Sequence, residues 1–176
     1  MMAVAGELTV EIRQLQRMDE AHTCAAFMSS SEPWVTLRRS YEDSIKMLVD
    51  PGREVYVAAV GQETVGFMIL QMRGAFIGYI QTVGILPAWR NRGIGSQLIQ
   101  FAEDRIFRET PNAFICASSF NPRVQRLYER LGYEVVGELK EYIVPGHSEI
   151  LLRKSIAPLT EFGRGVATID GGLENL

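Results

Sequence analysis

Residues 82–106 read TVGILPAWRNRGIGSQLIQFAEDRI, and the rest of the chain is interpreted outward from this stretch. Val83 and Ile85 alternate as strand residues do, and Pro87 ends that strand because proline cannot donate a hydrogen bond to a sheet. The segment RNRGIG then turns the chain. Apolar residues follow at every fourth position, as on one face of a helix: Ile94, Leu98, Ala102 and Ile106. The stretch is therefore predicted to be a strand, a tight basic turn and an amphipathic helix.

The turn has the composition of an anion-binding loop. Gly93 and Gly95 let the backbone approach a ligand closely, because glycine has no Cβ. The first N–H groups of the helix have no intrahelical partner and carry the positive end of the helix dipole. Arg90 and Arg92 add formal charge beside them. We expect a phosphate or pyrophosphate to bind here; the alternative is an ordinary helix N-terminus with solvated arginines.

Two common phosphate-binding motifs do not fit this loop. A P-loop requires a lysine directly before Ser96, and none is present. A dinucleotide-binding fingerprint requires a third glycine where Leu98 stands. The pattern that remains is R-x-x-G-x-G directly after a strand.

This pattern resembles the coenzyme A loop of the GNAT family, the GCN5-related N-acetyltransferases. A second segment, NPRVQRLYERLGY at residues 121–133, is similar to the family's N-x-x-A-x-x-L-Y-x-x-x-G-F segment. The resemblance covers residues 54–154 well and the N-terminal third loosely. Asn121 and Tyr128 are most similar to the ribosomal-protein alanine acetyltransferase branch, and Cys116 departs from it.

The resemblance implies an α/β (α+β) fold, with a mixed, mostly antiparallel central sheet splayed at a bulge and helices on both faces. The hydrophobic patterns give the same order, β-α-α-β-β-β-α-β-α-β-β. The expected strands are 8–12, 54–60, 64–73, 76–85, 113–117, 133–144 and 148–153, and the expected helices are 19–29, 37–49, 94–106 and 122–130. Residues 1–156 are expected to form one acyltransferase domain. The glycine-rich residues 157–176 are expected to be a flexible tail; a dimer-binding arm is the alternative, which leaves a homodimer open.

In the family, a bulge separates the strand before the loop from the next parallel strand, and free backbone N–H groups in the gap polarise the thioester carbonyl. Gly84 inside the strand is interpreted as the bulge, and close packing against a helix is the alternative. Asn121 matches the residue that binds the pantetheine arm and could also cap the helix that begins at Pro122. The resemblance implies the following cofactor-binding residues: Val83, Gly84, Ile85, Arg90, Asn91, Arg92, Gly93, Ile94, Gly95, Ser96, Asn121 and Tyr128.

Tyr128 is the predicted general acid. A phenol, with a reference pKa of about 10, can protonate the departing thiolate if it lies beside the sulfur. Tyr128 stands seven residues after Asn121, as in the family motif. Without that match, the residue would be interpreted as a half-buried aromatic packing beside Leu127 and Leu131.

The sequence does not identify the general base. Cys116 stands where some relatives have a glutamate, and we expect it to be a buried packing thiol. Tyr79 and Gln81 stand at the positions of other relatives' bases, and simple alternation would put them on one strand face with Val83 and Ile85. Either a water chain through Tyr79, Gln81 and Ser119 or a carboxylate elsewhere would take the proton. The candidate carboxylates, which the sequence does not rank, are Glu32, Glu138 and Glu149.

The substrate wall is expected around the segment SEPW, residues 31–34. Trp34 could form an aromatic face for the substrate, or it could cover the core. Tyr142 is expected to border the same cleft, and His147 is interpreted as a residue of the nearby turn.

Composition narrows the function classes. The net charge of −3 gives no overall basic field that would recruit nucleic acid. Cys24 and Cys116 lack metal-binding spacing and histidines are few, so no metal is predicted. The N-terminus lacks the features of a signal peptide, and no apolar run reaches membrane-spanning length. We therefore expect a cytoplasmic enzyme with neither nucleic-acid nor membrane partners.

Together these features predict an acetyl-CoA-dependent N-acetyltransferase. The amine of a small molecule, or of a peptide or protein N-terminus, would attack directly in a ternary complex. No serine–histidine–acid arrangement or activated cysteine indicates a covalent acetyl-enzyme. The alternative is a module that binds acyl-CoA as a sensor without turnover.

Overall fold

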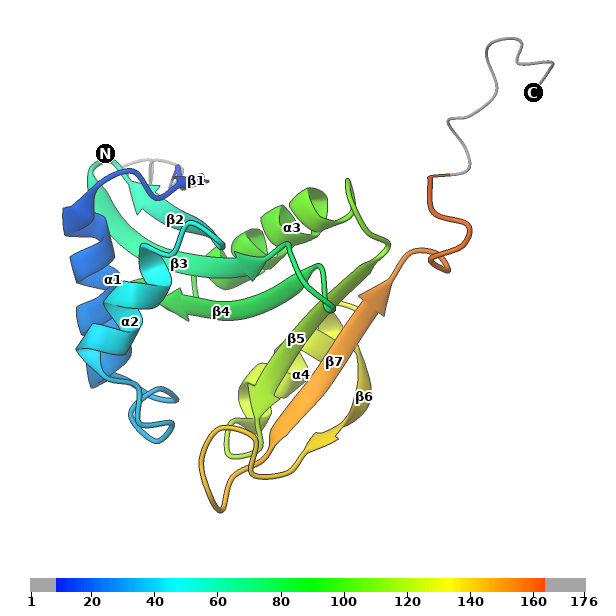
Figure 1. The fold of residues 1–176 in the computed structure, drawn as a ribbon. Helices are drawn as coiled ribbons and strands as arrows, with labels where there is room; N and C mark the ends of the chain where they lie inside the picture. The colour runs from blue at the N-terminus through cyan, green and yellow to red at the C-terminus, as the bar shows by residue number, and fades with distance from the viewer. Residues whose placement is uncertain (1–8, 164–176) are drawn as a thin grey trace, which may run out of the picture.

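The computed structural model describes residues 9–163 (Figure 1). Its strands are β1 (Glu11–Gln14), β2 (Glu54–Val60), β3 (Glu63–Gln71), β4 (Tyr79–Ile85), β5 (Asn112–Ser118), β6 (Glu134–Leu139) and β7 (Glu149–Ser155). Its helices are α1 (Met18–Ser30), α2 (Tyr41–Leu48), α3 (Ile94–Ile106) and α4 (Pro122–Arg130), with a 3-10 helix at Pro87–Trp89. The predicted order of strands and α-helices is confirmed. The expected tail at 157–176 and the start of the expected first strand lie partly outside the described residues.

The strands form one sheet in the order β1-β2-β3-β4-β5-β7-β6. Every neighbouring pair is antiparallel except β4 and β5, which are parallel. This parallel pairing is short: Tyr79 pairs with Phe114 and Ile80 with Ile115, and then the strands separate. Figure 1 shows β5 and β7 running away from β4 beyond this point. The expected mixed sheet with a splay is thus confirmed.

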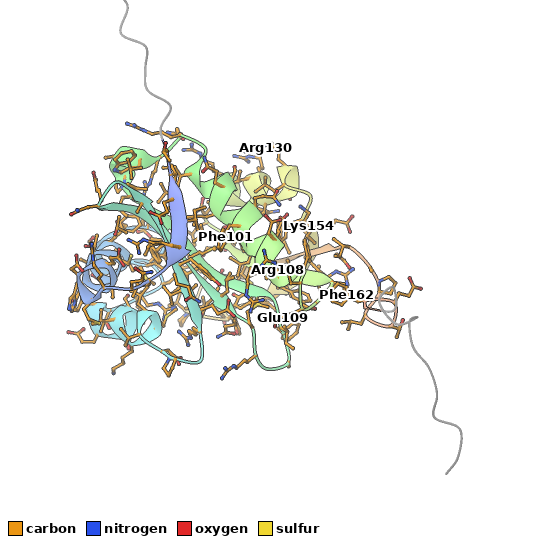
Figure 2. All side chains as sticks on the ribbon, turned by 90° about the horizontal axis from the view of Figure 1, so that it is seen from above. Phe101, Arg108, Glu109, Arg130, Lys154 and Phe162 are labelled. Carbon is orange, nitrogen blue, oxygen red and sulfur yellow. The ribbon has the colours of Figure 1, made fainter. Side chains whose placement is uncertain are left out.

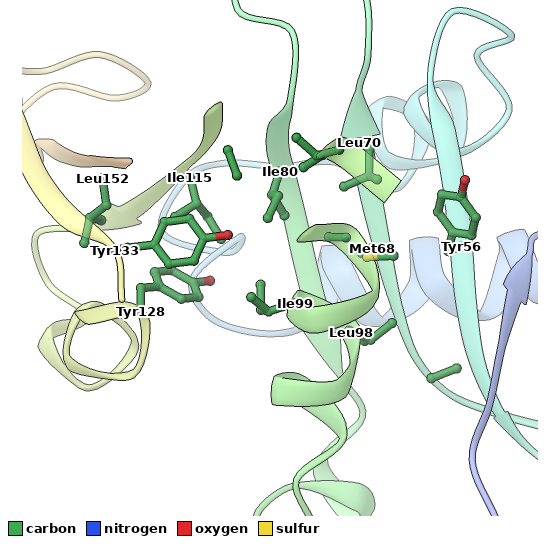
Figure 3. Packing of buried hydrophobic residues seen from close by; sticks show 14 of the residues in the cluster. Tyr56, Met68, Leu70, Ile80, Leu98, Ile99, Ile115, Tyr128, Tyr133 and Leu152 are labelled. Carbon is green, nitrogen blue, oxygen red and sulfur yellow. The ribbon is translucent and has the colours of Figure 1, made fainter. Parts of the chain in front are cut away.

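Strand β3 separates two hydrophobic cores. Met68 and Leu70 pack with α3 on one face, and Phe67 and Ile69 pack with α1 and α2 on the other. All four side chains are fully buried, because helices cover both faces of this strand. Figure 3 shows the first core, where Leu98 of α3 lies near Met68.

The second half of the sheet has one covered face. Helix α4 packs on it through Tyr128, which belongs to the same core as Ile115 of β5 and Leu152 of β7 (Figure 3). Lys154 of β7 pairs with Glu103 of α3 at 2.7 Å and joins the two halves (Figure 2). Within the described residues, no helix lies over the opposite face of β5 and β7 (Figure 1). We call this side, which no described helix covers, the open face.

The bulge lies at Gln81 and not at Gly84. Ile69 of β3 pairs with Thr82, and Leu70 pairs with Ile80, so Gln81 is the extra residue of β4. Gly84 is required by packing, because a Cβ there would lie 2.5 Å from Cε1 of Phe67 and 3.0 Å from Cη2 of Trp34. These contacts are with aromatic rings rather than with a helix.

The bulge also changes which residues share a face. Ile80, Val83 and Ile85 all pack against the core beneath α3, so the alternation of β4 is interrupted between Ile80 and Val83. The expectation that Tyr79 and Gln81 share a face with Val83 is wrong for this reason.

Three expected elements are longer than those observed. The fourth strand begins at Tyr79 because Gly78 turns the chain with a φ of 88°, which leaves Phe76 exposed in a loop. The sixth strand ends at Leu139, and Glu141 then accepts a hydrogen bond from Gly146 N at 2.9 Å within the following turn. The second helix begins only after Ser40, whose hydroxyl accepts from Asp43 N.

The first helix begins at Met18, one residue before its expected start, and Arg17 occupies the N-cap position. The carboxylate of Glu20 accepts the N–H groups of Gln16 and Arg17 and also pairs with Arg13. Glu20 therefore supplies the acceptor that fixes this helix N-terminus.

Candidate active site

A cavity of about 630 Å³ lies where β4 and β5 separate. Its lining comes from the end of β4, the following loop, the first turn of α3, helix α4 and the segment 27–34. Of the twelve cofactor-binding residues expected from the sequence, all but Arg92 line it. The guanidinium of Arg92 lies 4.9 Å from the ring centre of Trp89.

The first turn of α3 is an open anion cradle. Gly93 precedes it in the left-handed conformation, with a φ of 79°, and provides no side-chain cap. The N–H groups of Ile94, Gly95 and Ser96 are orphan donors by position. A Cβ on Gly95 would meet only Ile85, at 3.8 Å, so packing does not require glycine there. A glycine without a structural reason, at a helix N-terminus that lines a cavity, indicates close approach of a ligand.

Basic side chains surround this cradle. Arg90 donates through Nε to the carbonyl of Ile85 at 3.1 Å, which holds its guanidinium over the loop. Arg123 of α4 donates to Oδ1 of Asn91 at 2.5 Å, and Arg130 also lines the cavity. Figure 2 shows Arg130 at the far end of α4. Sequence reasoning missed Arg123 and Arg130, although their spacing of two helical turns places them on one helix face.

The end of β4 offers free backbone donors toward the splay. Leu86 N donates to Val65 O of β3, so alternation directs the N–H of Gly84 toward β3 as well. The N–H groups of Val83 and Ile85 consequently point to the side where β5 has separated. Only two of the three expected backbone donors thus face the gap.

Tyr128 lies beside this gap. It is 7% exposed, lines the cavity and lies near the ring of Tyr133, at 6.1 Å between ring centres (Figure 3). Burial, and secondarily the field of Cys116, raise the pKa of the Tyr128 phenol, so it keeps its proton at neutral pH. Asn121 caps α4 and also lines the cavity, as its two interpretations allowed.

Polar groups gather on the open face of the sheet next to the splay. Ser118 of β5 donates to Oε1 of Glu149 on β7 at 2.7 Å, and Glu149 is 5% exposed. Burial raises the pKa of the Glu149 carboxyl, and the Ser118 hydrogen bond partly offsets this rise. Tyr79 and Cys116 lie on this face as well, and burial raises the pKa of both groups. Cys116 is therefore a neutral thiol and not an activated nucleophile.

The three candidate carboxylates differ in their burial and in their surroundings. Glu32 lines the cavity but is exposed, and it accepts hydrogen bonds from the N–H and hydroxyl of Thr36. Glu138 pairs with Ile150, whose side chain packs on the helix-covered face, so Glu138 projects to that side. Glu149 alone of the three is buried.

The expected substrate residues are only partly brought together. Trp34 lines the cavity and also covers the second core, where it packs edge-on against Phe27 at 5.3 Å. Tyr142 is 65% exposed and does not line the cavity, although it contributes to the raised pKa of Tyr79. Gln81 is half-buried at the bulge, and its Oε1 has no hydrogen-bond partner within the described residues.

The sequence model of the acetyltransferase (GNAT) family matches residues 15–133. The chain belongs to the GNAT family of acetyltransferases. Within residues 9–163 no helix is both long and apolar enough to cross a bilayer. The same residues contain no group of three or more histidine, cysteine or acidic side chains arranged to hold a metal ion.

Solved structures of this family share the fold. A GNAT-family protein from Desulfovibrio desulfuricans superposes with a TM-score of 0.71 at 17% identity, over 85% of this chain and 100% of that one. The spermidine N-acetyltransferase from Vibrio cholerae, in complex with CoA and spermine, gives 0.64 at 19% identity, over 87% and 97%. An acetyltransferase from Thermus thermophilus gives 0.66 at 17% identity, over 85% and 98%. At these identities the likeness concerns the fold.

Proposed function

We propose that this protein is an N-acetyltransferase that moves an acetyl group from acetyl-CoA to a primary amine by direct attack in a ternary complex. The observation that carries the proposal is one cavity with an open anion cradle at its mouth and a buried, protonated Tyr128 beside the strand gap. Residues 1–156 would form the acyltransferase domain.

The residues present fit a coenzyme that carries a pyrophosphate. The first turn of α3, with Arg90 and Arg123 around it, would bind the phosphates. Asn121 also lines the cavity, where it would bind the pantetheine arm. Acetyl-CoA, when bound, supplies an acyl group activated as a thioester.

The chain's own groups would then act on that thioester. The N–H groups of Val83 and Ile85 would donate to the carbonyl oxygen as negative charge develops on it. Tyr128 would give its proton to the departing sulfur. Because the Cys116 thiol is neutral, a covalent acetyl-enzyme is not part of the proposal.

The acceptor could be a small amine or a peptide N-terminus. Trp34, Pro33 and Phe27 form an apolar wall of the cavity, which suits the aliphatic part of either acceptor. The resemblance to the ribosomal-protein alanine acetyltransferase branch supports a peptide, whereas Cys116 departs from that branch. The fold shared with a polyamine acetyltransferase motivates spermine as a test substrate.

The test is release of free thiol from acetyl-CoA by the wild-type protein and the Tyr128→Phe variant. The acceptors are spermine, n-butylamine and an alanine-initiated tripeptide amide. Turnover with at least one amine is expected, and the variant should lose about 100-fold in kcat. Tyr133→Phe is the matched control, because Tyr133 is a buried neighbour outside the cavity.

No thiol release with any amine, together with tight acetyl-CoA binding, would support the sensor instead of the enzyme. Equal rates for the wild type and Tyr128→Phe would remove Tyr128 from the mechanism.

A further inference from the structure

Three carboxylates are buried within the described residues, and only one of them has no cation. Glu20 is 1% exposed and pairs with Arg13 at 2.5 Å, and Glu103 is 4% exposed and pairs with Lys154 at 2.7 Å. Glu149 is equally buried, but its sole hydrogen-bond partner among these residues is the Ser118 hydroxyl. Burying an unpaired carboxylate destabilises the folded state, and packing alone does not explain why this chain contains one.

The register of the sheet puts this carboxylate beyond the point where β4 and β5 separate. Glu149 pairs with Ser118 and Leu151 pairs with Cys116, beyond the last β4–β5 pair at Ile80. Its side chain shares with Ser118 the face of β5 and β7 that no described helix covers. An acceptor would approach Glu149 from this face, which no described helix covers, while acetyl-CoA would occupy the helix-covered side.

Cys116 stands two residues before Ser118 on β5, so its side chain shares with Glu149 the face that no described helix covers. The unpartnered Oε1 of Gln81 lies at the bulge where the pairing ends. A carboxylate without a cation suits a group that carries positive charge and donates several hydrogen bonds, and a primary ammonium has this chemistry.

We infer that Glu149 binds the ammonium group of the acceptor and accepts its proton. This inference rests on the proposed function and names the general base for that reaction. Glu149 removes one proton from R–NH3⁺, and the freed lone pair of the nitrogen forms the new C–N bond. The C–S bond breaks with its electron pair on sulfur. Tyr128 protonates the sulfur and regains a proton from the acylated nitrogen. The products are the amide, a thiol and one proton on Glu149, which passes to solvent.

The first test does not depend on turnover. With glutamate side chains labelled at the ¹³C carboxyl and CoA present, spermine, n-butylamine and the tripeptide amide are added in turn at pH 8. At least one amine should move the Glu149 resonance and leave that of Glu138 in place. Calorimetry of the same amine should show at least 10-fold weaker binding to Glu149→Gln and unchanged binding to Glu138→Gln. A Glu149 resonance that no amine moves would overturn the inference.

The second test is the pH dependence of kcat/KM. Glu149 must be ionised to act, so the wild-type rate should fall as pH decreases through its raised pKa. In Glu149→Gln, kcat should fall about 100-fold, and the decrease of the rate at low pH (the acidic limb of the profile) should disappear. Ser118→Ala removes a hydrogen bond that favours the ionised form, so the limb should move to higher pH.

Controls distinguish Glu149 from other titratable groups, and they distinguish failure of this inference from failure of the proposed function. Around Glu149 the other titratable side chains are Tyr79, Cys116, Tyr142 and His147, and His147→Gln must leave the limb in place. An unchanged kcat and pH profile in Glu149→Gln would overturn the inference while the enzyme stands. If the wild type turns over no amine, the proposed function fails, and the carboxyl resonance still decides whether Glu149 binds an ammonium.

Discussion

The two sides of the cleft are built in opposite ways. The cofactor side is a continuous segment, residues 90–96, in which backbone donors and arginines come from adjacent positions. The acceptor side, as inferred above, would be assembled from three strands: Gln81 on β4, Ser118 on β5 and Glu149 on β7. A continuous segment binds through local conformation, whereas an assembled group depends on strand register across the sheet.

The two sides also differ in charge. Arg90, Arg123 and Arg130 surround the mouth of the cofactor side, whereas a buried carboxylate without a cation lies on the acceptor side. This polarity suits a polyanion entering on one side and an ammonium on the other. It also means that variants of the two sides should change different measured quantities.

The largest effect on the cofactor side is expected from Gly95→Asp. A carboxylate in the first turn of α3 would repel the phosphates and weaken acetyl-CoA binding by about 100-fold, although it favours the helix dipole. Gly95→Ala is the milder companion: it should weaken binding by about 10-fold and stabilise the fold by up to about 1 kcal/mol. Calorimetry and thermal unfolding measure the two quantities. Unchanged affinity in both variants would disprove the anion cradle.

Alanine at position 84 should change the stability of the fold in the opposite direction from alanine at position 95. A Cβ at Gly84 would lie 2.5 Å from the fully buried Phe67, so Gly84→Ala should destabilise the protein by about 2 kcal/mol. Urea unfolding of the two alanine variants gives the comparison. If Gly84→Ala is as stable as the wild type, packing does not explain this glycine.

Arg123→Ala should have a moderate effect confined to the cofactor side. Loss of its charge should weaken acetyl-CoA binding by about 5-fold at low salt and reduce the salt dependence of the dissociation constant. Arg108→Ala is the control, because Arg108 is exposed and does not line the cavity (Figure 2). Equal salt dependence in wild type and Arg123→Ala would remove Arg123 from the binding site.

The smallest effect concerns stability on the acceptor side. The folded-state pKa of Glu149 is raised, so the folded protein holds this proton more tightly than the unfolded chain does. At neutral pH the ionised carboxylate therefore costs stability, and the cost disappears as pH falls through the folded pKa. Glu149→Gln should unfold at or slightly above the wild-type temperature at pH 8. A clear loss of stability would indicate a structural role for Glu149.

The strand, turn and helix of the proposed cofactor side could be predicted from the sequence because their signals are local. Strand alternation, the glycine turn and the spacing from Ile94 to Ile106 all act within one segment, and the structure places them as expected. The order of elements followed from similar local patterns.

The acceptor side could not be predicted, because nothing local separates Glu149 from Glu138. Strand β7 begins at Glu149, which pairs with Ser118 and therefore lies on the open face of the sheet. Glu138 pairs with Ile150 and lies on the opposite face. The bulge at Gln81 was missed for a related reason, since Gly84 was the stronger local signal. Only the register with β3 shows that Gln81 is the extra residue.

The most direct test of this division is steady-state thiol release by the wild type, Gly95→Ala and Glu149→Gln, with acetyl-CoA and amine varied separately. We predict that Gly95→Ala raises the KM for acetyl-CoA about 10-fold with little change in kcat. Glu149→Gln should lower kcat about 100-fold with an unchanged KM for acetyl-CoA. If both variants change the same parameter to a similar extent, the cleft does not divide its two substrates between these two sides.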